Sequence, residues 1–357
     1  MRPDPPQISV IVPARDEETS LGACLLSLVG QAGIGFEIIV VDDGSTDRTP
    51  ALARSFPGVR VIDAGPLPEG WSGKNNAMSV GAREARAPWL LFTDADTVHL
   101  PGSLARTLLE AQQRGAALLS FSPEQEVHGI SEKAVMPVIF AELATTYRPA
   151  EVNDPATRVA AANGQYLLIS REAYDAVGGH AAVRASLLED VALARAVKAS
   201  GRRIFFRYGP DAVRTRMYRS FSQLREGWTK NLALLFRSPV QLAVLRLLEF
   251  GLMVGSLGAA ILGMLYGRSH TATFATMVFL GVGAIFVARV RKAHFSTGTT
   301  VLALLGLPLF SYLLLRSARS QEKGQVQWKG RSYAFGPAPQ PVPSGAKVVD
   351  HGRTRST

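Results

Sequence analysis

The sequence predicts an α/β fold: a mostly parallel sheet with helices on both faces, followed by apolar helices long enough to cross a membrane. Two observations predict the sheet. Short apolar, β-branched runs alternate with segments of helical spacing, and acidic pairs follow two of those runs. A third observation predicts the membrane helices, because the chain from Pro239 to Leu315 contains few charges.

Seven short runs are predicted to be strands. The first is a β-branched run closed by Pro13, and the second ends in Asp42-Asp43-Gly44. Because helical segments separate the runs, we expect neighbouring strands to be parallel. The predicted strands are Ile8–Val12, Phe36–Val41, Val59–Asp63, Trp89–Thr93, Ala116–Ser122, Asn163–Ser170 and Arg202–Tyr208.

Helical spacing of apolar residues fills the gaps between the strands. Ser45 or Thr46 is predicted to cap the helix that begins near Asp47. The amphipathic segment Ser131–Tyr147 fits either a core helix or a helix in the membrane interface. The other predicted helices are Glu17–Val29, Asn75–Ala85, Pro101–Arg114, a helix ending at Gly178-Gly179, Leu187–Ser200 and Phe221–Phe236.

Three apolar stretches follow: about Pro239–Tyr266, Thr271–Ala288 and Thr299–Leu315. A spanning helix needs about 20 apolar residues, so each is a candidate, and three buried helices of a soluble domain are the alternative. The basic loop Arg289–Lys292 fits the cytoplasm if the first helix leaves it. Three full crossings would put the tail outside, yet Arg316–Arg331 is also strongly basic. One stretch therefore fits a re-entrant or interfacial position, and the number of crossings stays open.

The charge balance predicts an anionic partner. The 357-residue chain has a net charge of +10 and a pI near 10.0, which suit nucleic acid or a membrane surface. The membrane is favoured, because basic residues flank the apolar stretches and no sequence signature of nucleic-acid binding occurs. A single cysteine, Cys24, excludes an internal disulfide. The start, Met1–Gln7, is polar and proline-rich and lacks the apolar region of a signal peptide, so the N-terminal part is expected in the cytoplasm.

Acidic residues at strand ends predict a metal site. Asp94 and Asp96 follow the run Trp89–Thr93, and Asp42-Asp43 follow an earlier run. Ligands collect where the carboxyl ends of parallel strands meet. Mg²⁺ and Mn²⁺ prefer carboxylate oxygen and keep several waters, so one or two aspartates suffice. A solvated acidic turn, or a helix cap in the case of Asp42-Asp43, is the alternative.

Two further features point to catalysis. The pair Glu189-Asp190 opens a predicted helix, where a carboxylate can act as a general base. The alternative is a structural pair favoured by the helix macrodipole. Lys74, in WSGKNNA before an alanine-rich helix, is placed to meet a phosphate oxygen, and a solvated lysine is the alternative.

Several motifs occur in a fixed order: ISVIVPARDEE, VVDDGSTDRT, LFTDAD, a GG pair and LLED. Together they resemble the family 2 glycosyltransferases of the GT-A fold, from about Ile8 to Trp228. The apolar C-terminal part makes the chain similar to the lipid-modifying branch, with its hopanoid-associated and carotenoid-acid glycosyltransferases. Polymerising members carry a Q-x-x-R-W element, whereas this chain has Gln223-Leu-Arg-Glu-Gly-Trp228. This departure argues against a processive polysaccharide synthase.

The resemblance implies a donor site at the sheet edge. Asp96 would coordinate Mg²⁺ or Mn²⁺, and Asp94 would contact the ribose or the waters of the metal. Such a cation neutralises charge on the departing diphosphate of a nucleotide sugar. Asp43 would read the nucleobase, with Asp42 supporting the turn. The remaining donor-binding residues implied are Pro13, Ala14, Glu17 and Lys74.

The resemblance also implies an acceptor side. Asp190 would be the general base and Glu189 would orient it, and a single displacement of this kind inverts the sugar carbon. Trp228 is expected to form an acceptor platform, and a helix packing on the membrane face is the alternative. His180 fits either an acceptor loop or an ordinary loop.

The sequence therefore predicts an inverting hexosyltransferase that moves one sugar from a UDP- or GDP-sugar to a membrane lipid of isoprenoid, hopanoid, carotenoid or glycerolipid type. The expected domains are a cytoplasmic catalytic domain (1–236), a membrane region with two to three helices (237–316) and a basic, largely disordered tail (317–357). The expected location is the cell membrane, with several crossings, and nucleic acid is not an expected partner.

Three rival functions are a processive polysaccharide synthase, a nucleotidyltransferase and a non-catalytic membrane scaffold. A nucleotidyltransferase would need a glycine-rich loop after the first strand, and the segment Val12–Asp16 contains no glycine.

Overall fold

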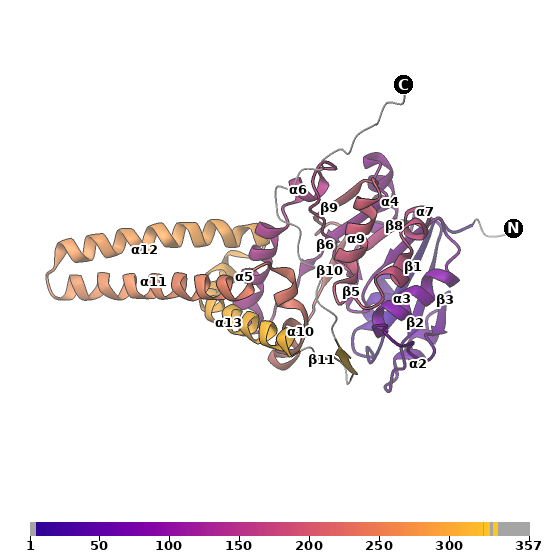
Figure 1. Cartoon of the computed structure of the whole chain (residues 1–357), viewed down its shortest axis with the longest axis horizontal. Coiled ribbons are helices and arrows are strands. Elements are labelled where there is room, and N and C mark those ends of the chain that lie inside the picture. Colours follow the sequence, from indigo (N-terminus) through magenta and orange to yellow (C-terminus); the bar gives the residue numbers. More distant parts are fainter. Residues whose placement is uncertain (1–4, 324, 329–330, 335–357) are drawn as a thin grey trace, which may run out of the picture. The chain divides into compact units, whose positions relative to one another are not determined.

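The computed structural model describes residues 5–323, 325–328 and 331–334 (Figure 1). These residues form two compact units. The first contains residues 5–126 and 147–216, and the second contains residues 127–146 and 217–334. The domain boundaries at 236 and 316 stay predictions. Most of the expected tail, from residue 335 onward, lies outside the described residues.

The first unit is built on a seven-stranded sheet. In spatial order its strands are β3 (Val59–Asp63), β2 (Phe36–Asp42), β1 (Ile8–Ala14), β4 (Trp89–Phe92), β8 (Leu167–Ser170), β6 (Leu118–Ser122) and β9 (Ile204–Tyr208). β8 runs antiparallel to its neighbours β4 and β6, and all other neighbours in this sheet are parallel. The predicted α/β fold with a mostly parallel sheet is confirmed.

The pairing register of β1 brings the carboxyl ends of neighbouring strands together. Ala14 at the end of β1 pairs with Asp42 at the end of β2. On the other side of β1, Ile11 pairs with Phe92 at the end of β4. The carboxyl ends of three strands therefore lie side by side at one edge of the sheet, where α/β proteins bind ligands.

Helices cover both faces of this sheet, as predicted. They are α1 (Leu21–Val29), α2 (Thr49–Arg54), α3 (Gly73–Glu84), α4 (Ser103–Arg114), α6 (Pro149–Asn153), α7 (Arg171–Ala176), α8 (Gly179–Ala182) and α9 (Glu189–Ala199). Residues of α3 and α9 share an apolar cluster with Ile11 of β1. Residues of α1 and α4 share a second cluster with Val12, whose side chain points to the opposite face.

Two local predictions were wrong. Neither Ser45 nor Thr46 caps α2, which begins at Thr49 with Arg48 at the cap position. Both residues bind Asp16 instead: the Asp16 amide donates to Ser45 Oγ (3.0 Å), and the Thr46 amide donates to Asp16 Oδ1 (2.7 Å). A small sheet of β5 (Thr97–His99), β10 (Val213–Thr215) and β7 (Glu124–Gln125) was also missed. Strands of two or three residues are too short to show a periodicity.

The second unit is mainly helical. Its elements are α5 (Ile130–Thr146), α10 (Phe221–Asn231), the 3₁₀ turn η1 (Leu232–Leu235), α11 (Pro239–Leu265), α12 (Ser269–Val290), the 3₁₀ turn η2 (Arg291–Ala293), α13 (Thr297–Glu322) and the hairpin of β11 (Gln325–Trp328) and β12 (Arg331–Ala334). α11 and α12 run side by side as an antiparallel pair (Figure 1). Among the described residues, three helices are long and apolar enough to cross a membrane: Pro239–Leu265, Ser269–Ala293 and Thr297–Glu322.

The segment Ser131–Tyr147, which fitted either a core helix or a helix in the membrane interface, is a core helix in the structure. This segment is α5, and its residues Val135 and Ile139 lie in the apolar core of the second unit with Leu307 and Phe310 of α13. α13 itself continues beyond the predicted end at Leu315, because the residues that follow are good helix formers.

Candidate active site

The acidic turn at the end of β4 carries strong negative charge. Asp94 follows β4, and Asp96 directly precedes β5. The Oδ1 atom of Asp96 is buried and has no hydrogen-bond partner in the described residues. Burial, followed by the charges of Asp94 and Glu17, raises the pKa of Asp96 to about 8. The turn is therefore a place where a cation would be stabilised.

The second acidic pair opens α9, as predicted. The Asp190 side chain accepts two backbone hydrogen bonds, from Gly164 N to Oδ2 and from Val191 N to Oδ1, both at 2.8 Å. Burial, followed by the charge of Glu189, raises the pKa of Asp190 to about 7 although these hydrogen bonds lower it. A carboxylate with such a pKa can accept a proton near neutral pH.

Lys74 joins the two acidic elements. It lies in the first turn of α3, whose cap residue Ser72 accepts a hydrogen bond from the Asn75 amide. The Lys74 Nζ atom lies 2.8 Å from Asp94 Oδ1 and 2.9 Å from Glu189 Oε1. Burial would lower the pKa of Lys74, but the charges of Asp94 and Glu189 raise it well above its usual value. The ammonium group is therefore a fixed positive charge between the two pairs.

Gly164 lets these groups approach one another. A Cβ atom at this position would lie 3.0 Å from Lys74 Nζ, 3.5 Å from Glu189 Oε1 and 3.6 Å from Asp190 Oδ2. Even an alanine here would require the Lys74 ammonium group to shift by a few tenths of an ångström. No functional role could be predicted for Gly164, which lies within the predicted strand Asn163–Ser170.

A hydrogen-bond network lies behind the acidic turn. Thr97 Oγ1 donates to the Asp94 carbonyl (2.7 Å), and Thr215 Oγ1 donates to the Asp96 carbonyl (3.3 Å). Gln165 Nε2 donates to Thr215 Oγ1 (3.3 Å), and the Gln165 carbonyl accepts from Thr93 Oγ1 (2.8 Å). Gln165, which follows Gly164, is thus linked through hydrogen bonds to the turn that carries Asp94 and Asp96. Sequence reasoning missed these residues.

The expected nucleobase-binding residues meet at the ends of β1 and β2. The Asp43 amide donates to the Ala14 carbonyl (2.9 Å), and Arg15 Nη1 donates to the Asp43 carbonyl (3.0 Å). Asp42 Oδ2 accepts from the Ser45 amide (3.3 Å). Pro13 and Ala14 belong to the last residues of β1. Glu17 follows this loop, and its charge acts on Asp96.

The loop before α9 is held by Asn75, a residue that sequence reasoning did not single out. Its side-chain amide donates to the carbonyls of Val183, Arg184 and Ser186, each at 3.0 Å. Lys74 and Asn75 are adjacent, so the start of α3 positions both the ammonium group and the loop that leads to Glu189. The run KNN in WSGKNNA is the only signal that could have pointed to this role.

Comparison with known proteins identifies the family. The family described as "Glycosyl transferase family 2" matches residues 9–178. A 4,4'-diaponeurosporenoate glycosyltransferase of Staphylococcus aureus (strain MRSA252) is 30% identical over 341 residues, which cover 92% of this chain and 88% of the relative. The enzyme of the same name from strain bovine RF122 / ET3-1 is also 30% identical over 341 residues. The chain belongs to glycosyl transferase family 2.

A solved structure supports the fold of this family 2 glycosyltransferase. A mannosyltransferase from Pyrobaculum calidifontis, in complex with GDP-Man and Mn²⁺, superimposes with a TM-score of 0.52 at 16% identity. The likeness covers 89% of this chain and 87% of that one. This likeness confirms the predicted GT-A fold, and the family and the S. aureus relatives confirm the predicted enzyme class.

The site of this glycosyltransferase fits a divalent cation. In the part of the chain that the structure describes, no group of three or more His, Cys, Asp or Glu side chains is arranged to hold a metal. Mg²⁺ needs fewer protein ligands, because it keeps waters and takes phosphate oxygens. The partnerless Oδ1 of Asp96 and the crowding of negative charge from Asp94 and Glu17 are what such an ion would relieve.

Trp228 and His180 are both buried, each in a different unit. Trp228 lies in α10 and packs against Phe140 and Tyr218 of the second unit (ring centroids 6.4 and 6.2 Å apart). His180 in the first unit contacts the Tyr174 hydroxyl through Nδ1 (2.9 Å) and lies edge-on to Phe92. Burial lowers the pKa of His180 to about 4. An acceptor role for Trp228 stays a prediction.

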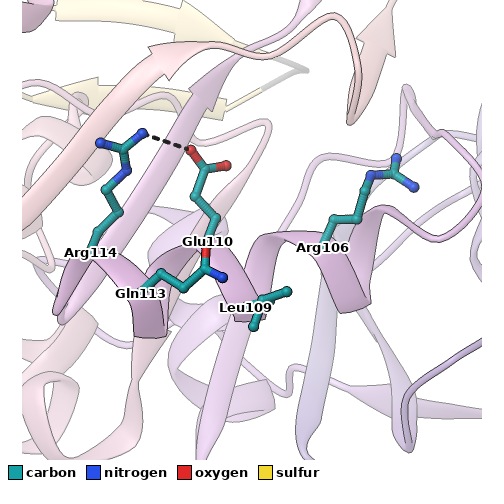
Figure 2. Close-up of a pocket in the computed structure, with 5 residues that line it drawn as sticks. All are labelled: Arg106, Leu109, Glu110, Gln113 and Arg114. Atoms are coloured by element: carbon teal, nitrogen blue, oxygen red, sulfur yellow. Dashed lines mark ion pairs between the residues drawn. The ribbon is translucent and has the colours of Figure 1, made fainter.

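A pocket on α4 contains none of the predicted site residues. Figure 2 shows Glu110 and Arg114 turned toward each other, 3.9 Å apart. The pocket is lined by Arg106, Leu109, Glu110, Gln113 and Arg114. Its lining is one face of one helix, so nothing there converges on a ligand as the groups around Lys74 do.

Proposed function

We propose that this glycosyltransferase moves one sugar from a nucleotide-sugar donor to the carboxyl group of a polyisoprenoid acid in the membrane. The observation that carries the proposal is the pair of contacts made by Lys74 Nζ, to Asp94 at 2.8 Å and to Glu189 at 2.9 Å. They bring a turn suited to a metal and a diphosphate next to a helix start suited to proton transfer. The name of the S. aureus relatives supports the choice of a carotenoid-type acid.

On the donor side, the residues of the sheet edge bind and orient the nucleotide. Asp96 and Asp94 would hold Mg²⁺ or Mn²⁺, which supplies positive charge to the departing diphosphate. Lys74 adds a second positive charge facing the same phosphate oxygens. Asp43, Asp42, Pro13, Ala14 and Glu17 would contact the base and ribose of a UDP- or GDP-sugar.

On the acceptor side, Asp190 would take the proton. An acid group of a lipid at an apolar surface has a raised pKa and so retains its proton. As the acceptor oxygen attacks the anomeric carbon, its proton passes to an oxygen of Asp190, whose pKa of about 7 suits that transfer. The bond from the sugar to the diphosphate breaks in the same displacement, and the sugar carbon is inverted. Glu189, held by Lys74, would keep Asp190 in place.

The apolar helices would place this reaction at a bilayer. The three long helices of the second unit have the length and composition of membrane spans. We propose a location in the cell membrane, with several crossings and the catalytic unit in the cytoplasm, where nucleotide sugars are found.

Transfer into lipid tests the proposal. Full-length protein in vesicles is given radiolabelled UDP- and GDP-sugars with a polyisoprenoid acid or the matching alcohol, in Mn²⁺, Mg²⁺ or EDTA. We expect label in the organic phase with the acid, loss of transfer in EDTA, and release of the sugar by mild alkali, because the product is an ester. Absence of transfer from every donor to either acceptor would refute the proposal.

A lipid hydroxyl is the second candidate acceptor, and the pKa of Asp190 favours it. A lipid hydroxyl must lose its proton in the transition state. Its reaction therefore depends more on a general base than the reaction of a carboxyl acceptor does. Its product is a glycoside that resists mild alkali. Product length on a lipid primer separates both candidates from a processive polysaccharide synthase.

A further inference from the structure

We infer that, of the three candidate spans in the described residues, α11 and α12 cross the membrane as a hairpin, whereas α13 stays on the same side as the catalytic unit. The inference rests on the proposed membrane location and goes beyond it, because length and composition alone make all three helices candidate spans. Contacts within the second unit distinguish α13 from the other two.

The first step concerns α5, which cannot span a bilayer. Both of its ends return to the first unit: the Glu126 amide donates to the Thr215 carbonyl (2.8 Å), and Tyr147 packs against an apolar cluster of that unit. The first unit is a folded sheet domain, whose loops cannot lie in lipid. A crossing by α5, roughly 25 Å long at 1.5 Å per residue, would put its ends on opposite sides of the membrane. α5 therefore stays on the catalytic side.

The second step places α13 beside α5. Gly306 of α13 contacts the Ala134 carbonyl of α5 so closely that a Cβ atom there would overlap it. Val138 of α5 flanks the same point, and Leu307 and Phe310 of α13 are fully buried. A helix packed this tightly along a non-spanning helix lies on the same side as that helix.

The C-terminal half of α13 is covered by further polar segments. The Ala233 amide of η1 donates to Ser317 Oγ (3.0 Å), and Gln321 Nε2 donates to the Lys230 carbonyl (2.9 Å). α10, which contains Lys230, carries too many polar residues to lie in hydrocarbon. One face of α13 is thus packed against protein along most of its length.

The hairpin shows the opposite pattern. In their most apolar stretches, α11 is 22% buried and α12 is 17% buried, against 44% for α13. Large apolar side chains are exposed along α11 and α12, for example Leu248, Leu265, Phe274 and Ile285. A helix that is apolar all round lies in a protein core or spans a membrane, and the described residues do not cover these two helices, so a bilayer fits them.

Four largely buried charges mark where the hairpin leaves the membrane. Arg246 binds both oxygens of Glu142 of α5 (2.8 and 3.0 Å) and one oxygen of Glu249 (2.9 Å). Arg289 Nη2 binds Glu249 (2.7 Å), and Arg289 Nε lies 3.1 Å from Glu142. Between Glu249 and Arg289 the only Asp, Glu, Lys or Arg residue is Arg268, at the hairpin turn.

The length of the hairpin beyond these charges is close to the thickness of a bilayer. The arm of α11 after Glu249 and the arm of α12 before Arg289 measure roughly 24 and 30 Å at 1.5 Å per residue. The hydrocarbon core of a bilayer is about 30 Å thick. Two crossings also leave both basic segments, Arg289–Lys292 and that from Arg316 onward, on the catalytic side, as basic loops prefer.

Cysteine accessibility tests the inference. A full-length Cys24→Ala parent receives one cysteine at Ala51 in the first unit, Ser269 at the hairpin turn, Thr297 at the start of α13 or Lys323 after its end, all exposed. Sealed cells are treated with a membrane-impermeant maleimide, and inverted vesicles are treated in parallel. Labelling after detergent denaturation shows that each cysteine is present and reactive.

We expect Ser269→Cys to be labelled in sealed cells, and the other three only in inverted vesicles. Labelling of Lys323→Cys from the same side as Ser269→Cys would mean three crossings and would overturn the inference. Labelling of all four from the Ala51→Cys side, or recovery of the protein without membranes, would also overturn it. Sugar transfer measured on the same vesicles reports separately on the proposed function.

A matched pair of arginine variants gives a second measurement. Leu257 of α11 and Leu305 of α13 are both exposed apolar residues (41% and 58%). We expect Leu257→Arg to lower the membrane-inserted fraction by about tenfold or more, as a charge within a span does, and Leu305→Arg to leave it unchanged. An equal loss from both variants would contradict the inference.

Discussion

The two acidic elements of the first unit differ in what surrounds their second carboxylate. In each, Lys74 binds the first member, Asp94 or Glu189. In each, the second member has a raised pKa, about 8 for Asp96 and about 7 for Asp190. The carboxylate of Asp190 accepts two backbone hydrogen bonds, whereas Oδ1 of Asp96 has no hydrogen-bond partner in the described residues.

This difference separates two kinds of chemistry. A carboxylate oriented by fixed backbone donors keeps its geometry while it gains and loses a proton, which suits a base. A carboxylate with a bare buried oxygen beside other negative charges is costly until a cation binds. We therefore expect the two aspartates to respond differently to the same substitution.

The largest expected effect is that of Asp190→Asn. Removal of the base should lower kcat by about 10²–10⁴-fold with a hydroxyl acceptor, and by less with a carboxyl acceptor, whose proton is more acidic. Calorimetric titration with UDP or GDP should show unchanged nucleotide affinity. A variant that loses nucleotide binding as well would indicate a structural role for Asp190.

Asp96→Asn should act on the metal and not on the base. If Asp96 is a ligand, its loss should weaken Mn²⁺ affinity by at least about 100-fold, since even residues behind metal ligands contribute 10–100-fold. Mn²⁺ binding in the presence of nucleotide is the measurement. Asp190→Asn is the control, because it should leave Mn²⁺ affinity unchanged. Equal Mn²⁺ affinity in both variants would remove the distinction between the two acidic elements.

The pH profile sharpens the comparison further. The base form of Asp190 predominates above its pKa, so the rate should rise about tenfold per pH unit below 7 and level off above it. Glu189→Gln removes a charge that raises this pKa, and the midpoint should move to lower pH. Lys74→Met removes a charge that lowers it, and the midpoint should move to higher pH. Shifts in the same direction would exclude Asp190 as the titrating group.

The smallest expected effect belongs to the network behind the acidic turn. Thr215→Val removes the hydrogen bonds to Asp96 and Gln165, and should lower the free energy of unfolding by about 1 kcal/mol per lost bond. Thr107→Val, which removes bonds to Ser103 and Tyr166 elsewhere in the first unit, should cost a similar amount. Only Thr215→Val should also weaken Mn²⁺ binding, by a few-fold. Chemical denaturation and metal titration measure the two effects.

The sequence predicted those features that short segments determine. Buried strands such as β1 and the order of the motifs follow from local composition, and the structure and the family confirm them. The ends of parallel strands must meet, so the proximity of Asp42 and Ala14 could also be predicted.

Features that depend on distant residues could not be predicted. The hydrogen bond between Thr215 and Asp96 joins residues 119 positions apart, and the one from Gly164 to Asp190 joins residues 26 apart. No local pattern encodes such pairs. The prediction that Ser45 or Thr46 caps α2 was wrong for the same reason. Both residues form hydrogen bonds with Asp16, some thirty positions away.

The four largely buried charges at the base of the α11–α12 hairpin also restrict how this sequence can change. The charges of the two arginines and two glutamates cancel. Loss of one side chain would leave an opposite charge unpaired and lower the free energy of unfolding by about 3–5 kcal/mol. Replacement of an arginine and a glutamate together by apolar residues is far less costly. Substitutions at Glu142, Arg246, Glu249 and Arg289 should therefore be tolerated as neutral pairs and rejected singly, which a library randomised at these four codons would reveal.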